Sequence, residues 1–260
     1  MGILNAAYET IRARLDDDIC FVQIHRPDAN NTINGRLTAE IDGVLRACEG
    51  SAKIVVLEGL PEVFCAGADF KEIQSGVEQN LGREQDPGPL YDVWQRLALG
   101  PYITVAHVQG RANAGGIGFV AACDIVVSEN KATFGLSELL FGLMPACVLP
   151  FLIRRVGFAK ANFMTLTTQP VSAAQAREWG LVDVCEDNSE NLLRKQLLRL
   201  RRLGRDGIAR YKRYAGSLDD VLTRSKPQAL AANVEVFSDP NNLQKIARYV
   251  RTGKFPWEPD

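Results

Sequence analysis

The feature that most constrains this chain is a repeated alternation between short apolar runs and segments with helical spacing. Four runs have the β-branched content and flanking turn residues of strands, at residues 19–24, 54–59, 102–108 and 125–128. Between the first two runs, apolar residues recur on one helix face, at Leu37, Ile41, Val44 and Leu45. Strand and helix alternate to about residue 185, which predicts an α/β domain with parallel strand pairing.

The chain changes character after residue 190. Leucines keep helical spacing among arginines, while glycines become few and strand patterns disappear. The sequence therefore predicts a core over residues 1–190 and a helical segment over residues 191–260 that packs on the core or on a neighbouring subunit. Residues 74–89 are rich in glycine, proline and charge, and predict a mobile surface loop that is a candidate lid.

Charge and hydropathy exclude several function classes. The 260 residues include 30 Lys or Arg and 31 Asp or Glu, and a net charge of −1 argues against nucleic-acid binding over the whole surface. The longest uncharged apolar stretch, residues 142–153, is too short to span a bilayer. The first residues lack the basic and apolar regions of a signal peptide. We therefore expect a soluble cytoplasmic protein with no membrane or nucleic-acid partner.

Cysteine and histidine usage argues against a metal centre and against a hydrolase triad. The six cysteines form no CxxC pair and are interpreted as reduced, mostly buried thiols. The two histidines, His25 and His107, are far apart, and neither lies in a GxSxG context. Neither a zinc site nor Ser-His-Asp chemistry is expected.

Three segments can carry chemistry, and the first is Phe64-Cys65-Ala66-Gly67-Ala68-Asp69-Phe70. Small residues let the backbone approach a ligand closely, and N–H groups in such a turn can point at a carbonyl oxygen. The same residues also suit a plain strand-to-helix connection. Cys65 is predicted to be a small core or pocket residue rather than a reactive thiol.

The second segment, residues 110–118, joins the strand at 102–108 to a helix of small apolar residues. The N-terminus of that helix offers free N–H donors and a positive dipole end, which stabilise developing negative charge. The pattern is neither GxGxxG nor a P-loop, so dinucleotide and nucleotide sites are not predicted. Tight helix–sheet packing would use the same glycines.

The third segment, residues 134–143, places Glu138 among apolar residues. An unpaired buried carboxylate is costly, so its pKa should rise and the group could serve as a base or acid near neutrality. A surface glutamate or a structural salt bridge is the better interpretation of this segment taken alone.

Together, in this order and spacing, the three segments resemble the crotonase (enoyl-CoA hydratase/isomerase) superfamily. His25-Arg26-Pro27, the CAGAD run, AGG followed by Cys123-Asp124, FGLSE and WGLVD at 179–183 all fit, and the resemblance covers about residues 8–257. It implies a crotonase-like spiral of ββα units, followed by C-terminal helices that mediate trimer formation, with trimers pairing into hexamers in many members.

The resemblance implies a specific active site. The backbone N–H groups of Ala68 and Gly115 would form an oxyanion hole for a thioester enolate, and Glu138 would be the catalytic acid. Family hydratases use two glutamates: the second falls on Glu138, while the first would fall on Gly118, so this chain lacks it, and the glycine would leave space for a branched β-carbon. Substrate contacts are expected at Ala66, Gly67, Asp69, Gly116 and Gly118, with Asp69 holding its loop. No cofactor is expected beyond the phosphopantetheine or CoA that carries the substrate.

A closer resemblance is to the dehydratases of polyketide β-branching cassettes, carried by Asn30–Asn34, Glu58–Phe64, Ser137–Gly142, Pro145–Arg155 and Phe255–Glu258. It implies dehydration of 3-hydroxy-3-methylglutaryl on an acyl carrier protein to 3-methylglutaconyl. The alternatives are the decarboxylase of the same cassette, a general short-chain enoyl-CoA hydratase or isomerase, and a non-catalytic scaffold or RNA binder.

Basic residues supply candidates for anion and partner binding. The distal carboxylate of the substrate needs a cation or donors, for which Lys71, Arg83 and Arg111 are candidates. Nine basic side chains, here called the basic strip, lie within residues 194–213: Arg194, Lys195, Arg199, Arg201, Arg202, Arg205, Arg210, Lys212 and Arg213. The strip could steer an acidic carrier protein. A solvated helix face, subunit contacts or a phosphate site are together the favoured interpretation.

Overall fold

The structure of the chain is a computed structural model that describes residues 7–78 and 86–259. Its long strands form one sheet in the order β1-β2-β3-β5-β7-β10. They are β1 (Ile11–Asp16), β2 (Ile19–Ile24), β3 (Ile54–Glu58), β5 (Ile103–Val108), β7 (Ile125–Glu129) and β10 (Val184–Glu186). Only the β1–β2 hairpin is antiparallel among these pairs of the described chain, and the other neighbours are parallel.

A second sheet of very short strands has the order β4-β6-β8-β9. They are β4 (Val63–Cys65), β6 (Arg111–Asn113), β8 (Thr133–Gly135) and β9 (Val171–Ser172). The first three are parallel, and β9 joins β8 antiparallel. Chain order alternates between the sheets, with β3 leading to β4, β5 to β6 and β7 to β8. The predicted spiral of ββα units is therefore confirmed.

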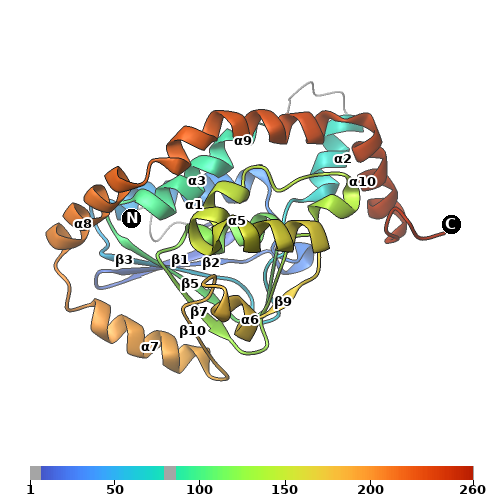
Figure 1. Cartoon of the computed structure of the whole chain (residues 1–260). Coiled ribbons are helices and arrows are strands. Elements are labelled where there is room, and N and C mark those ends of the chain that lie inside the picture. Colours follow the sequence, from blue (N-terminus) through green and yellow to red (C-terminus); the bar gives the residue numbers. More distant parts are fainter. Residues whose placement is uncertain (1–6, 79–85, 260) are drawn as a thin grey trace.

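Helices follow the strand pairs and fill the space around both sheets (Figure 1). They are η2 (Pro27–Ala29), α1 (Gly35–Cys48), α2 (Phe70–Glu78), α3 (Gly88–Leu99), α4 (Gly115–Ala122), η3 (Glu138–Phe141), α5 (Leu149–Thr167) and α6 (Ala173–Glu178). Ser172 caps the start of α6, because its Oγ accepts a hydrogen bond from Gln175 N.

The C-terminal region is helical, as predicted, and consists of α7 (Ser189–Leu200), α8 (Arg205–Leu218), α9 (Val221–Ser238) and α10 (Pro240–Thr252). Leu192, Leu193 and Leu197 of α7 pack on one face of the large sheet, against a cluster that includes Ile54 and Val105. Figure 1 shows α9 running from the α8 end of the molecule to α10, which lies beside α2.

The loop predicted over residues 74–89 is wrong at both ends. Residues 74–78 belong to α2, and residues 88–89 begin α3. The apolar residues Phe70 and Ile73 hold α2 against an aromatic cluster, so packing outweighs the polar composition. Residues 79–85, including the candidate Arg83, lie outside the described residues.

Candidate active site

The turn after β4 presents the first amide of the site. Gly67 has a φ of 98°, which glycine adopts without strain. Ile33 N–H donates to Gly67 O at 2.7 Å, and Asp69 N–H donates to Ile33 O at 2.9 Å. Successive amides of an extended chain point to opposite sides, so the intervening Ala68 N–H points away from Ile33. Within the described chain this N–H has no acceptor.

The start of α4 brings a second amide against this turn. Gly115 is the first residue of the helix, where an N–H lacks an intrahelical acceptor. A Cβ built on Gly67 would lie 2.7 Å from Ala114 Cβ and 3.6 Å from Gly115 N, so the two backbones are in contact. Ala114 itself has φ 50° and ψ −122°, a strained conformation of the kind that clusters at functional sites. The structure therefore places position 115 beside positions 67 and 68.

Glu138 begins η3, and its environment is apolar. The residue is only 9% exposed, and Oε2 has no hydrogen-bond partner among the described residues. Burial raises the pKa of Glu138 to about 7. The interpretations as a surface glutamate or a salt-bridge partner are wrong, because the side chain is buried and makes no ion pair within the described chain. A carboxyl with this pKa can both accept and return a proton near neutrality.

Asn113 links all three segments, a role that the sequence analysis did not assign. Its Nδ2 donates to Ser137 Oγ at 2.8 Å and lies 3.5 Å from Ala66 O. Asn113 is also paired with Gly135 across the β6–β8 ladder. The residue before Glu138, the turn after β4 and the start of α4 therefore share one amide side chain. The sequence signal for this linking role is an asparagine placed between a strand and a glycine-rich helix start.

Asp69 holds its loop, as predicted. Its Oδ2 accepts from Arg26 Nη2 at 2.9 Å, and both side chains are largely buried. Its Oδ1 accepts from Lys71 N at 3.2 Å, in the first turn of α2. The HRP motif thus supplies the arginine that anchors the CAGAD turn. These contacts make Asp69 an anchor of its loop.

Gly116 and Gly118 are fixed by packing. A Cβ on Gly116 would lie 2.6 Å from Cys65 O, so α4 approaches β4 too closely for any side chain. A Cβ on Gly118 would lie 2.5 Å from Trp94 Cζ2. The expectation that Gly118 leaves room for a branched β-carbon is therefore wrong, because the Trp94 indole fills that space. Substrate contact by Gly116 stays a prediction.

Cys65 is a core residue, as predicted. It is fully buried in β4. Burial raises the pKa of its thiol to about 12, so the sulfur stays protonated and is a poor nucleophile.

An aromatic wall, which was not predicted, packs on η3, the short helix that begins at Glu138. Phe141 contacts Phe70 at 5.0 Å and Tyr249 at 5.2 Å between ring centroids, and Phe255 lies 5.3 Å from Tyr249. The wall joins η3, α2 and the C-terminal helix α10. Asn242 Nδ2 of α10 donates to Gly142 O at 3.0 Å, which fixes α10 on the end of η3.

The candidate cations have exposed side chains. Lys71 is exposed on α2, and Arg111 is exposed at the start of β6.

The basic strip is divided by the fold. Lys212 is buried against Asp124, and Arg201 lies 3.5 Å from Asp16 Oδ2. Figure 1 shows α7 and α8 at the opposite end of the molecule from α2 and α10.

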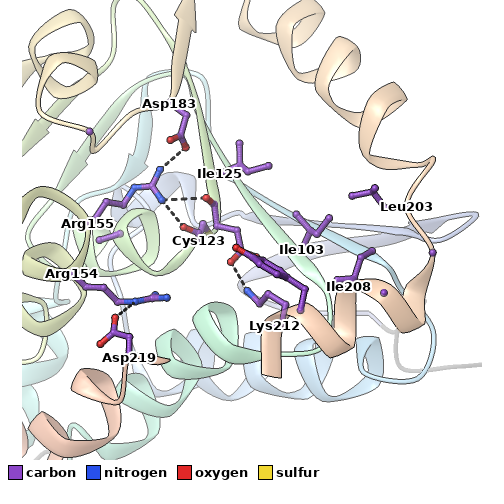
Figure 2. A pocket seen from close by; sticks show the side chains of 16 residues that line it. Ile103, Cys123, Ile125, Arg154, Arg155, Asp183, Leu203, Ile208, Lys212 and Asp219 are labelled. Atoms are coloured by element: carbon purple, nitrogen blue, oxygen red, sulfur yellow. Dashed lines mark hydrogen bonds and ion pairs between the residues drawn. The ribbon is translucent and has the colours of Figure 1, made fainter. Parts of the chain in front are cut away.

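A cavity of about 870 Å³ lies between α8 and the turn that leads from α4 to β7 (Figure 2). Arg155 pairs with Asp183 at 2.5 Å and also donates to Cys123 O at 3.0 Å. Arg154 pairs with Asp219 at 3.0 Å, and Lys212 pairs with Asp124. Each cation already has a carboxylate, so the cavity offers little net attraction to an anion, and it contains none of the three chemical segments.

His107 takes part in an arrangement that the sequence analysis did not expect. Its Nδ1 lies 2.9 Å from Glu58 Oε1, and its Nε2 lies 2.9 Å from Ser189 Oγ. His107 and Ser189 are buried, and both ring nitrogens and the hydroxyl already have hydrogen-bond partners within the protein. These hydrogen bonds connect β3 and β5 to the start of α7 and are structural.

Among residues 7–78 and 86–259, no group of three or more His, Cys, Asp or Glu side chains could hold a metal ion. None of the helices in that part of the chain combines the length and the apolar character that crossing a bilayer demands.

Comparison with known proteins places the chain among characterised sequences. It matches the family described as Enoyl-CoA hydratase/isomerase over residues 14–260. It is 55% identical over 252 residues to the Bacillaene synthase dehydratase PksH of Bacillus subtilis (strain 168), covering 96% of this chain and 97% of that protein. It is 30% identical over 193 residues to the Hydroxycinnamoyl-CoA hydratase-lyase of Pseudomonas fluorescens, covering 70% and 68%.

A solved structure of a similar protein has the same fold as this chain. A crystal structure of a polyketide biosynthesis enoyl-CoA hydratase (pksH) from Bacillus subtilis superposes with a TM-score of 0.93 at 55% identity, covering 96% of this chain and 100% of that chain.

Proposed function

The chain belongs to the enoyl-CoA hydratase/isomerase family and is an enzyme of its hydratase and dehydratase type, and from this premise we propose that it dehydrates 3-hydroxy-3-methylglutaryl bound to an acyl carrier protein. The product is 3-methylglutaconyl-acyl carrier protein, an intermediate of polyketide β-branching. The observation that carries the proposal is the buried carboxyl of Glu138, with a pKa near 7, in the segment that Asn113 ties to two adjoining free amides.

The two amides supply the electrostatic part of the mechanism. The thioester oxygen accepts hydrogen bonds from Ala68 N–H and Gly115 N–H. As the C2 proton leaves, negative charge develops on that oxygen, and both donors stabilise it. A single donor of this kind contributes about 2.7–4 kcal/mol to lowering the barrier.

Glu138 carries the proton in both directions. As a carboxylate it takes the proton from C2, and as a carboxylic acid it returns that proton to the departing C3 hydroxyl. The C2–H and C3–O bonds break, the C2–C3 double bond forms, and water leaves. One carboxyl suffices because the proton removed equals the proton delivered, so the missing acid at position 118 does not block the reaction.

Glu138 also favours dehydration over the alternatives. Decarboxylation generates the enolate by loss of carbon dioxide, and it needs no base at C2. Burying a carboxyl without an ion-pair partner costs folding free energy, and a scaffold or RNA binder would gain no function from it. The 55% identity to a protein named a dehydratase of bacillaene synthase supports a role in polyketide assembly over general fatty-acyl hydration.

We further propose a homotrimer. Large apolar side chains are exposed on α5 and α8, namely Phe158, Phe163, Leu166, Tyr211, Tyr214 and Leu218. Exposed apolar surface of this extent is typical of an interface. Sedimentation of the purified chain tests the proposal, and a monomer at micromolar concentration would refute it.

Mass spectrometry of the carrier protein tests the proposed reaction directly. Carrier protein loaded with 3-hydroxy-3-methylglutaryl should lose one water on incubation with the enzyme, and the corresponding CoA thioester provides a parallel arm. Loss of carbon dioxide from 3-methylglutaconyl-carrier protein would instead identify the decarboxylase. No change in mass with either carrier would overturn the proposal.

A further inference from the structure

Two complementary polar atoms of the described chain are buried without partners. Within the described residues, the buried side-chain nitrogen and oxygen atoms that lack a hydrogen bond are Trp94 Nε1, Tyr102 Oη and Glu138 Oε2. An indole N–H can only donate, and an ionised carboxylate can only accept. Leaving either group unpaired in the core costs free energy, so a ligand that satisfies them is favoured.

The Trp94 ring occupies the place of the missing acid. A Cβ on Gly118 would lie 2.5 Å from Trp94 Cζ2 and 2.6 Å from Cε2. The same Cζ2 lies 3.8 Å from the Cβ position of Gly115, which supplies the second amide. The Gly118 Cβ position also lies 2.7 Å from Cη2, so position 118 stands over the face of the six-membered ring. Nε1 is bonded to Cε2, and its N–H lies in the plane of the ring beside position 118.

The indole is held rigidly in this position. Trp94 is 1% exposed, and its ring makes T-shaped contacts with Phe119 and Phe151, each at 5.8 Å between centroids. A donor fixed by packing on several sides loses little entropy when it binds a ligand, so its direction can discriminate between ligands.

We propose that Trp94 Nε1–H binds the C3 hydroxyl of the substrate and so selects 3-hydroxyacyl thioesters. The inference rests on the proposed dehydration. A hydroxyl group donates and accepts at once, so it can accept from Trp94 while it donates to Glu138 Oε2. The N–H also stabilises the oxygen as the C3–O bond breaks. The indole thus supplies a hydrogen bond in a site where Gly118 replaces one of the two glutamates of family hydratases.

The first test removes the N–H and keeps an aromatic ring. Trp94→Phe should lower kcat/KM for 3-hydroxy-3-methylglutaryl pantetheine by about 10- to 100-fold, as expected for loss of a hydrogen bond to a developing charge. Binding of 3-methylglutaryl pantetheine, which lacks the hydroxyl, should change much less. Tyr102→Phe is the matched control, because it deletes another unpartnered buried polar atom and should leave both values unchanged. A Trp94→Phe protein that keeps its preference for the hydroxylated ligand would overturn the proposal.

The second test keeps Trp94 and does not depend on turnover or on the folding of that variant. The chain has three tryptophans, so its ¹⁵N-indole spectrum has three signals, and Trp179→Phe and Trp257→Phe assign Trp94 by elimination. The hydroxylated ligand should shift the Trp94 N–H proton downfield on Glu138→Gln protein, and the deoxy ligand should not. Equal shifts with both ligands would refute the contact. If the wild type binds both ligands without dehydrating either, the proposed function fails, while these spectra still decide the role of Trp94.

Discussion

Asn113 Nδ2 lies 2.8 Å from Ser137 Oγ, so one hydrogen bond joins the end of β6 to the residue that precedes Glu138. Asn113 is followed by Ala114, the strained residue that orients the start of α4. This one hydrogen bond therefore helps to position both the Glu138 carboxyl, which follows Ser137, and the Gly115 amide, which lies two residues after Asn113. This linkage connects two segments that are 24 residues apart in sequence.

Replacing Glu138 with Gln should abolish dehydration and leave the fold intact. The amide has nearly the same shape, and it cannot take the C2 proton, so kcat should fall by at least about 10³-fold. Mass spectrometry of the loaded carrier protein measures the loss. Glu178→Gln, at an exposed position of α6, is the control. Undiminished turnover by Glu138→Gln would reject the assigned role.

The rate of dehydration should depend on the ionisation of Glu138. The base must be a carboxylate, and burial raises the pKa of Glu138 to about 7. We therefore expect kcat/KM to be constant well above pH 7 and to fall about tenfold per pH unit below it. Stopped-time assays across pH 5–9 measure the profile. A profile that is flat down to pH 5 would show that no such group is the base.

The same group should make stability depend on pH. The pKa of Glu138 rises from an ordinary value of 4.5 to about 7 on folding. Between these pH values the native state therefore binds more protons than the unfolded state. The free energy of unfolding should therefore decrease by roughly 3 kcal/mol as pH rises from about 4.5 to 7. Urea titrations at both pH values measure it, and Glu138→Gln should lack this component. An identical pH dependence in that variant would contradict the assignment.

Gly67→Ala should reduce activity more than an alanine substitution at another glycine with positive φ. The residue has a φ of 98°, and its Cβ would lie 2.7 Å from Ala114 Cβ, so the turn must move away from α4. We expect kcat to fall by roughly 10²-fold as one amide loses its alignment. Gly157→Ala is the matched control, with a φ of 76° and no atom within 4 Å. Equal effects of the two substitutions on activity would refute the alignment argument.

Gly118→Ala should destabilise the protein, because the new methyl group would lie 2.5 Å from Trp94 Cζ2. Overpacking of this kind costs about 1–3 kcal/mol. Gly43→Ala on α1 meets no atom within 4 Å and should be neutral or stabilising, since alanine favours a helix. Chemical denaturation compares the two. A neutral Gly118→Ala would restore the interpretation that position 118 borders open space.

The spiral core could be predicted because its long strands are buried runs with clear boundaries. Residues 19–24 and 125–128 fall almost entirely on β2 and β7. The second sheet was missed because strands of two or three residues are too short to show a period. β1 was missed because three of its six residues, Arg12, Arg14 and Asp16, are charged and only Ile11 is buried.

The sequence motifs located the proposed amides and the carboxyl, and tertiary packing decided their environment. No local pattern shows that Glu138 is buried with one oxygen unpaired, because η3 packs against α5 and α10, which come from later parts of the chain. The position of Trp94 over Gly118 is equally non-local, since α3 meets α4 only in the folded molecule.

The contact between Asn242 of α10 and Gly142, just after η3, joins residues that are 100 positions apart in sequence. Closing so long a loop costs conformational entropy, so we expect this contact to form after the spiral core has folded. Until α10 docks, the end of η3 lacks this anchor. Docking of α10 is therefore a late folding event that sets the final position of the helical turn beginning at Glu138.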